Sequence, residues 1–326
     1  MVRGGGGDPT YDLLMAKQQL EEGRTIRLVE LQDLEENALV APVAFMGAPL
    51  VCIEKLPSGR EFEAILQRIH KTLGKSVTHL LPAEIGGANA FTPLTAGAQF
   101  DLPVVDADTL GRAFPELQMS SCNLKGVSPS PAFLADTHGN VVVVKAKDAH
   151  DLEHRSREIT VEMGSSAALC TYLMSGKQCQ GSVIPGTLSR GIAIGKSLRQ
   201  GEDPVKALLD CADGIVLGHG MIVDIDQRIE EGFLKGAFSV HGDDNVLKVF
   251  YQNEYLAVFN EKEAIALTPD IIIPIEQDSG TPITSESLVY GLRVVLIAIP
   301  GPELWKTPEG LKLVGPQYFG YSKESS

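Results

Sequence analysis

The first two thirds of the chain alternate between segments with helical and strand-like spacing of their apolar residues. TYDLLMAKQQLEEG predicts a helix over residues 10–23, and EFEAILQRIHKTLG predicts an amphipathic helix over residues 61–74 that ends at a glycine. TIRLVEL, residues 25–31, and LPVVDAD, residues 102–108, have the spacing of strands. This alternation predicts an α/β domain with a mostly parallel sheet and helices on both faces.

The apolar pattern changes near residue 213. Three further helical segments are expected before this point, over residues 151–173, 185–201 and 203–211. From Gly214 onward, short alternating runs are separated by Gly, Asp and Asn turns, which is typical of an antiparallel barrel or sandwich. Among them, KVFYQNEYLAVF is interpreted as one strand whose polar QNE centre needs water or a partner surface. We therefore expect an α/β domain over residues 1–213 that carries the Gly-rich loops, and a β-barrel or sandwich-like domain over residues 214–326.

Composition narrows the class of protein. The 326 residues are 44% hydrophobic and carry a formal net charge of −14, which argues against nucleic-acid or anionic-membrane partners because both need a basic face. No apolar run approaches the roughly 18 residues that a membrane helix needs. The five cysteines are odd in number and form no C-x-x-C pair, which suits reduced thiols in a cytoplasmic protein. We expect a small molecule as the binding partner.

The segment LLPAEIGGANAFTPL is the first candidate for a functional loop. A strand that ends at Glu84 and turns through Gly86 and Gly87 places polar groups at the carboxyl edge of the sheet, where open α/β sheets bind ligands. Glycines let backbone N–H groups approach a ligand, and Asn89 can both donate and accept hydrogen bonds. The alternative is a tight strand-to-helix turn in which Glu84 only caps the helix.

The segment VVDADTLGRAFPELQM repeats this design. Asp106 and Asp108 follow a strand, and Arg112 and Glu116 lie within the next turns. Two carboxylates at this spacing can hold a divalent metal, or act as acid and base if their surroundings separate their pKa values. The alternative is a helix N-terminus whose acids favour the helix dipole, with Arg112 paired to one of them.

Other motifs are weak or missing. HDLEH, residues 150–154, has the H-x-x-E-H spacing of one metalloprotease class, but it lies in a strongly charged segment and no third ligand is evident. The chain has no P-loop and no strand-borne G-x-G-x-x-G, so neither ATP nor NAD is expected as a cofactor. A divalent metal stays possible, and its identity is open.

Several blocks together resemble one family. They are GGGGDP, PAEIGGANAF, VVDADTLGRAFPELQM, SPSPAFLADTHGN, VEMGSSAA, IPGTLSRGIAIGK, YQNEYLAVF, TPDIIIPIEQDSGTPITSESLVYGLRVVLI and VGPQYFGY. In this order they resemble the hydantoinase-associated family long catalogued as a domain of unknown function and represented by S-methyl thiohydantoin desulfurase. The resemblance implies an α/β amino-terminal domain, a β-rich carboxy-terminal domain, and chemistry on hydantoin-like cyclic amides or thioamides.

The resemblance also bears on the glycine run at residues 4–7. In the family this run follows an apolar strand, whereas this chain begins at the glycines, so we expect the first strand to be absent. Gly6 and Gly7 are expected to bind substrate beside the Gly86–Gly87 turn, with Asp8 and Pro9 starting the next helix.

Two functional hypotheses follow from the residues and the resemblance. The first is a hydrolase acting on a C–S or C–N bond of a hydantoin-type ring, with Glu84 or Asp106 as the base. Asn89 and the two glycine amides would then stabilise the oxyanion, and Arg112 and Glu116 would contact the substrate; Asp106 and Asp108 are the catalytic or metal-binding alternatives. The second is a non-catalytic accessory subunit of a hydantoinase- or oxoprolinase-type enzyme, and a homo-oligomer is possible in either case.

Overall fold

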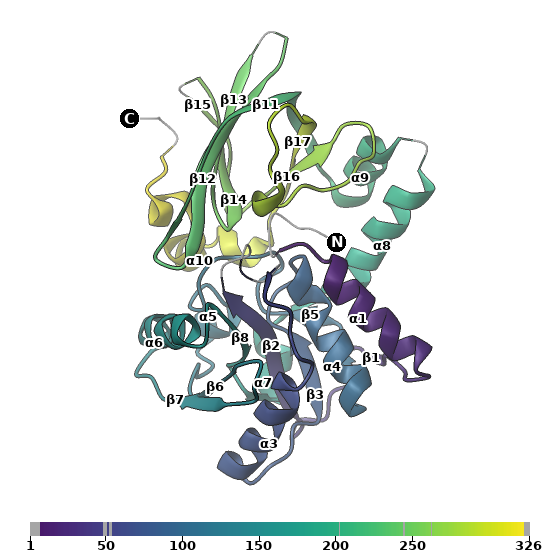
Figure 1. Ribbon diagram of the computed structural model, residues 1–326, viewed down its shortest axis with the longest axis vertical. Coiled ribbons are helices and arrows are strands. Elements are labelled where there is room, and N and C mark those ends of the chain that lie inside the picture. Colours follow the sequence, from purple (N-terminus) through teal and green to yellow (C-terminus); the bar gives the residue numbers. More distant parts are fainter. Residues whose placement is uncertain are drawn as a thin grey trace. The chain divides into compact units, whose positions relative to one another are not determined.

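The computed structural model describes residues 7–47, 51, 54–201, 203–243, 245–261 and 263–322 (Figure 1). The chain forms two compact units. Of the described residues, those within 8–111 and 116–188 form the N-terminal unit, and Gly7, Arg112–Pro115 and those from Ser189 onward form the C-terminal unit. The boundary expected at residue 213 falls on the residue that caps the C-terminus of helix α9 (Pro204–Ala212), and Gly214 separates this residue from the first strand of the C-terminal sheet.

The N-terminal unit is built on one sheet with the strand order β1-β4-β3-β2-β8-β6-β7, and β9 also pairs with β2. Its strands are β1 (Leu28–Val29), β2 (Leu39–Gly47), β3 (His79–Pro82), β4 (Val104–Val105), β6 (Ala132–Ala135), β7 (Val141–Val144), β8 (Ser166–Cys170) and β9 (Met174–Ser175). From β1 to β2 the strands are parallel, and from β2 to β7 they are antiparallel. The α/β class is confirmed, but the sheet is mixed because the hairpin β6–β7 and strand β8 extend it with antiparallel pairs.

Helices cover both faces of this sheet, as the sequence predicts. They are α1 (Thr10–Glu21), α3 (Glu61–Leu73), α4 (Thr92–Phe100), α5 (Ser121–Leu124), α6 (Ala149–Glu162) and α7 (Gly176–Ser182), with 3-10 turns η1 (Leu31–Asp33) and η2 (Ala88–Ala90). On one face, Phe62 of α3 packs edge-on against Phe45 of β2, and α4 approaches β4 at Gly97. On the other face, Met46 of β2 packs in a core cluster with Leu152 of α6.

One sequence expectation in this unit is wrong. The helical segment expected over residues 151–173 ends at Glu162, and residues 166–170 form the buried strand β8 inside the sheet. Gly164 and Ser165 both have positive φ angles, 86° and 63°, which stop the helix. The small residues of SSAALC then fit between neighbouring strands with both faces covered, a setting in which a strand does not show polar alternation.

The C-terminal unit contains one antiparallel sheet of order β15-β14-β13-β12-β11-β17-β16. The strands of this sheet are β11 (Ile215–Glu230), β12 (Phe233–His241), β13 (Val246–Gln252), β14 (Glu254–Asn260), β15 (Glu263–Leu267), β16 (Ile271–Glu276) and β17 (Arg293–Ile299). The unit also contains helices α9 and α10 (Pro308–Val314), and 3-10 turns η3 (Ser285–Ser287), η4 (Glu303–Lys306) and η5 (Pro316–Phe319). Helix α8 (Thr187–Gln200) begins in the N-terminal unit and belongs to the C-terminal unit from Ser189 onward. The sheet curls like half a barrel (Figure 1), which confirms a β-rich domain. Helices α8 and α9 cover β16 and β17, where Ile194 and Leu208 join the core cluster of Ile273 and Ile297.

The QNE segment is a turn, so the interpretation of KVFYQNEYLAVF as one strand is wrong. Strands β13 and β14 form a hairpin in which Gln252 pairs with Glu254 and Asn253 alone turns the chain, at φ 56°. Asn253 donates its backbone N–H to the Leu234 carbonyl and accepts the Leu234 N–H on its side-chain oxygen, both at 2.8 Å. Asparagine tolerates this left-handed conformation, and its side chain anchors the turn to β12.

Candidate functional site

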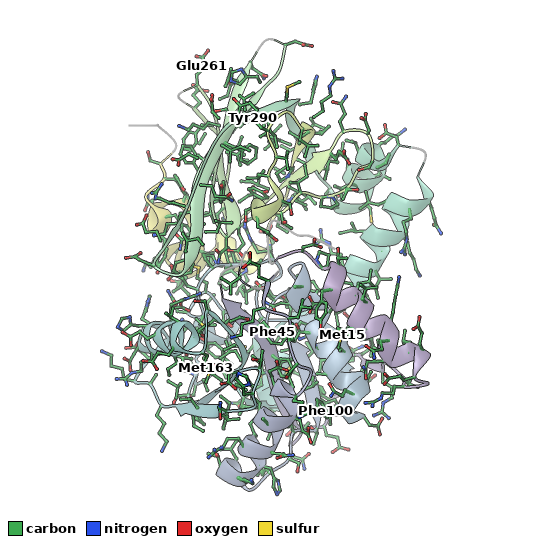
Figure 2. All side chains as sticks on the ribbon, viewed as in Figure 1. Met15, Phe45, Phe100, Met163, Glu261 and Tyr290 are labelled. Carbon is green, nitrogen blue, oxygen red and sulfur yellow. The ribbon has the colours of Figure 1, made fainter. Side chains whose placement is uncertain are left out.

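Glu84 and Asn89 form the centre of the candidate site in the N-terminal unit. Glu84 follows the end of β3 and is 9% exposed. The Asn89 amide nitrogen donates to Glu84 Oε1 at 2.7 Å and to the Phe45 carbonyl at 3.1 Å. Its oxygen accepts the Phe45 N–H at 2.7 Å. Asn89 therefore fixes a buried carboxylate to the carboxyl end of β2; Phe45 is labelled in Figure 2.

Thr109 joins the two loops that the sequence singles out. Its backbone N–H and its hydroxyl both donate to the Ala83 carbonyl, at 3.3 and 2.6 Å. The loop that carries Glu84 is thus hydrogen-bonded to the loop that carries Asp108, next to the carboxyl ends of the parallel strands β3 and β4. Both loops share one edge of the sheet because each directly follows its parallel strand.

Asp106 and Asp108 are buried and accept backbone hydrogen bonds. Asp106 Oδ1 accepts the N–H of Leu188, in the first turn of α8, at 2.9 Å. Asp108 Oδ2 accepts the N–H groups of Leu110 and Gly111 at 3.0 and 2.7 Å. These bonds are the helix-capping and turn-closing roles that acidic side chains commonly take.

Strand pairing holds this loop from a further direction. Strand β5 (Ala107–Asp108) pairs antiparallel with β10 (Ile184–Pro185), and the Asp106 carbonyl accepts the Gly186 N–H at 2.8 Å. The start of α8 is therefore fixed to the DAD segment by main-chain and side-chain bonds together.

Arg112 belongs to the C-terminal unit, where its fully buried guanidinium binds backbone carbonyls. Nε donates to Ala113 at 2.9 Å, and Nη2 donates to Tyr255 at 3.1 Å. Nη1 donates to Asp270 at 2.6 Å and to Pro269 at 3.2 Å. The guanidinium carbon also lies 4.6 Å from the centre of the Phe114 ring. These contacts connect residues 112–115 to the curled sheet.

The other predicted substrate contacts are placed as follows. The Gln118 side-chain nitrogen donates to half-buried Glu116 in the N-terminal unit. Gly86 and Gly87 are buried directly before η2. Gly7 has a φ of 77°, and Gly6 lies outside the described residues. Their expected contact with substrate stays a prediction.

No group of three or more His, Cys, Asp or Glu side chains in the described residues is arranged to hold a metal ion. The HDLEH segment lies on α6, where His154 is exposed beside Glu158. Glu153 points inward instead: it accepts the Leu117 N–H at 2.9 Å and pairs with Arg157 at 2.7 Å. Burial raises the pKa of Glu153, and the Arg157 charge opposes that effect.

Asp12 is an ionisable group near this region that sequence reasoning missed. It lies in the first turn of α1, a helix that contacts α4 and η2. Burial, together with the charge of Asp8, raises the pKa of Asp12 to about 6. The sequence gives no signal of this burial, because an acid in the first turn of a helix commonly lies at the surface and favours the helix dipole.

The fold and the loop geometry define a two-unit α/β plus β protein with a buried carboxylate at the edge of its mixed sheet. The chain belongs to the S-Me-THD-like family: residues 2–146 match its N-terminal domain and residues 146–326 its C-terminal domain. A comparison with curated proteins finds no match.

A solved structure supports the fold. A protein from Chromobacterium violaceum, a structural-genomics target, is 24% identical in sequence to this chain, and its crystal structure matches this one with a TM-score of 0.79. The alignment covers 99% of this chain and 94% of that one. No helix in the described part of the chain is long and apolar enough to cross a membrane.

Proposed function

We propose that this protein is a hydrolase that acts on a C–S or C–N bond of a hydantoin-type ring, as an S-methyl thiohydantoin desulfurase does. The observation that carries the proposal is the buried Glu84, held by Asn89 at the carboxyl edge of the sheet, in a chain that matches both domains of the S-Me-THD-like family. A cytoplasmic location and a small-molecule substrate are parts of the same proposal.

Glu84 is the proposed general base. It takes a proton from water while the water oxygen bonds to the ring carbon that carries the leaving group. The C–S or C–N bond then breaks, and the leaving sulfur or nitrogen receives the proton from Glu84. Asp106 is the less suitable base because its Oδ1 accepts the amide of Leu188 and so holds helix α8.

Asn89 is assigned a positioning role in this scheme. One amide nitrogen provides two hydrogens, and here it donates to Glu84 and to the Phe45 carbonyl. The backbone amides of Gly86 and Gly87 are therefore the proposed donors to the developing oxyanion. Asp106 and Asp108 organise the neighbouring loop, and metal analysis of the purified protein tests their alternative role as ligands.

The test is turnover of hydantoins and S-methyl thiohydantoins by the purified full chain. Glu84→Gln is expected to lower kcat/KM by at least about a hundredfold, the usual effect of losing a general base, while thermal shifts still report ligand binding. Glu63→Gln, on the exposed side of α3, is the matched control and should leave turnover unchanged. Asn89→Ala is expected to displace the acidic limb of the kcat/KM profile, which a purely structural role would not do.

Two results would count against the proposal. Full activity of Glu84→Gln would exclude this carboxylate as the base. A complete lack of turnover, with retained binding to a hydantoinase-type enzyme, would favour the accessory-subunit hypothesis instead.

A further inference from the structure

Strand β7 leaves one edge of the N-terminal sheet open. It is the last strand in the sheet order, and among the described residues only β6 pairs with it. The strand consists of four consecutive valines between Asn140 and Lys145, and Val142 is 38% exposed. A β-branched edge without proline or a bulge readily accepts another strand, and natural proteins seldom leave such an edge uncovered.

The register shows which backbone groups face outward. Asp136 donates its N–H to the Asn140 carbonyl at the hairpin turn, so this pair is hydrogen-bonded. Hydrogen-bonded and non-hydrogen-bonded pairs alternate along an antiparallel ladder. Val142 and Val144 therefore bond to β6 through their pairs with Leu134 and Ala132. The N–H and C=O groups of residues 141, 143 and 145 point away from β6, toward the open edge.

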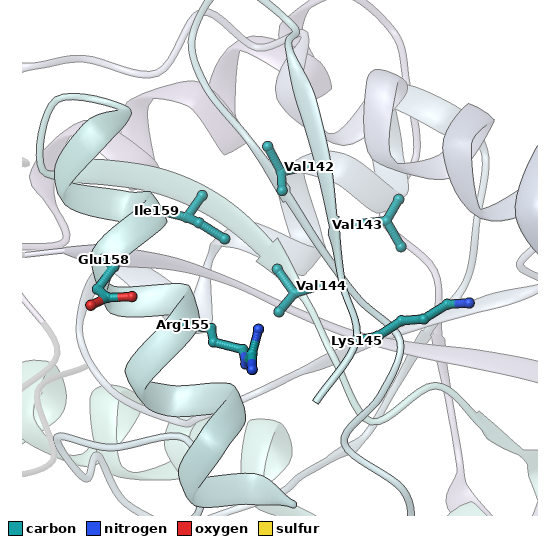
Figure 3. A pocket seen from close by; sticks show the side chains of 7 residues that line it. All are labelled: Val142, Val143, Val144, Lys145, Arg155, Glu158 and Ile159. Atoms are coloured by element: carbon teal, nitrogen blue, oxygen red, sulfur yellow. The ribbon is translucent and has the colours of Figure 1, made fainter. Parts of the chain in front are cut away.

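A hollow lies beside this edge. It has a volume of about 250 Å³ and is lined by Val142, Val143, Val144, Lys145, Arg155, Glu158 and Ile159 (Figure 3). Figure 3 shows Val142 and Val144 on the side of α6, and Val143 and Lys145 on the opposite side. On the face that α6 covers, the apolar part of the hollow is formed by Val142, Val144 and Ile159.

The hollow is lined by charges of both signs from one helix. Four residues separate β7 from α6, and Arg155 and Glu158 of α6 line the hollow together with β7. Figure 3 shows the Arg155 side chain beside Val144, and Glu158 farther along the helix, next to Ile159. Arg155 pairs with Asp151 at 2.8 Å, and Glu158 pairs with His154 at 3.4 Å. The side chains of Arg155 and Glu158 are nevertheless 54% and 65% exposed.

We propose that β7 pairs with β7 of a second copy of this chain, antiparallel about a two-fold axis at Val143. In this register Val143 faces Val143, Val141 faces Lys145, and Val142 faces Val144. The outward groups of residues 141, 143 and 145 then bond to each other, as edge-strand addition requires. The two-fold axis also places Arg155 of each copy next to Glu158 of the other, which is the reciprocal pairing of an isologous interface.

The first test is the mass of the full chain in solution, measured by sedimentation and light scattering over a range of concentrations. The wild type is expected to be a dimer, and Val143→Pro is expected to be a monomer. Proline removes an N–H that faces outward, so the bonds to β6 remain. Val143→Thr keeps the N–H and should stay dimeric. A monomeric wild type, or a Val143→Pro variant that stays dimeric, would overturn the proposal.

The second test locates the contact and does not depend on how well the proline variant folds. Residues of a hydrogen-bonded antiparallel pair lie about 5.5 Å apart at Cα, within disulfide range. In a background without Cys52 and Cys211, Val143→Cys should form a cross-linked dimer under mild oxidation. Val141→Cys, which faces Lys145 of the other copy, should not. Equal cross-linking of both variants, or of neither, would contradict the two-fold axis at Val143.

Discussion

Among the candidate site residues, Arg112 offers the sharpest test of whether a residue has a structural or a substrate-binding role. Sequence reasoning assigns it to the substrate, whereas its guanidinium donates to the carbonyls of Ala113, Tyr255, Pro269 and Asp270 within the C-terminal unit. The perturbation is Arg112→Met, which keeps an unbranched apolar stem and removes every donor.

The expected cost follows from these contacts. Leaving a buried acceptor without its donor costs about 1–3 kcal/mol, and Arg112→Met does this to four carbonyls. Because relaxation of the site recovers part of this cost, we expect a total of about 3–5 kcal/mol. A change of 1 kcal/mol shifts the melting temperature of a domain of this size by about 2–4 °C, so a decrease of about 6–20 °C is expected. The melting temperature of Arg112→Lys should lie between those of the wild type and Arg112→Met, because lysine keeps the charge but loses the planar fork of donors.

Thermal unfolding followed by calorimetry measures this effect. Arg68→Met, on the exposed side of α3, is the matched control and should stay within about 0.5 kcal/mol of the wild type. An Arg112→Met protein that melts within about 2 °C of the wild type would refute the structural role. Loss of ligand binding at unchanged stability would return Arg112 to the substrate site.

Three further changes probe other parts of the structure. Asp12→Asn should stabilise the protein by up to about 3 kcal/mol at about pH 8, because the folded state there holds an ionised carboxyl whose pKa burial raises to about 6. The gain in unfolding free energy should fade as the pH drops from about 6 to about 4, where Asp12 of the folded wild type is protonated. Equal gains at about pH 6 and about pH 4, measured by urea unfolding, would contradict this. Asn253→Ala should cost more than Asn253→Gly in chemical denaturation, because both lose the bond from the Leu234 N–H but only alanine strains at φ 56°. Thr109→Val removes the 2.6 Å bond to the Ala83 carbonyl and should cost about 0.5–1.5 kcal/mol, and an unchanged denaturation midpoint would show that this bond does not hold the two loops together.

Much of the fold follows from local patterns. The helix at Glu61–Leu73 has an apolar stripe and a glycine directly after it, and both features are visible in the sequence. In the structure that glycine ends the helix at φ 66°. Strand β8 is different, because both of its faces are covered and its small residues show neither helical nor alternating polarity. The hairpin at Asn253 is hidden for a different reason: only the polar triplet QNE marks the reversal, and its one-residue turn is shorter than the two-residue loops that hairpin sequence patterns indicate.

The candidate site also has some features that a local sequence pattern indicates and others that depend on distant residues. The sequence indicates that polar groups cluster after β3 and β4, and the hydrogen bonds of Thr109 to Ala83 connect those two segments. Which polar group does which task depends on partners far along the chain. Asn89 is 44 residues from Phe45, and no local pattern reports that its amide is engaged by the end of β2.

Asp106 and Asp108 show how far spacing can inform function. Asp108 accepts hydrogen bonds from residues two and three positions ahead, so an acid two residues before L-G already predicts a closed turn. Asp106 accepts its hydrogen bond from Leu188, 82 residues away, where it holds the first turn of α8. Two carboxylates that look equivalent in the sequence are thus bound to different parts of the fold. Substituting Asp106 should therefore loosen the start of α8, whereas substituting Asp108 should loosen its own loop, and hydrogen exchange at Leu188 and Gly111 separates the two effects.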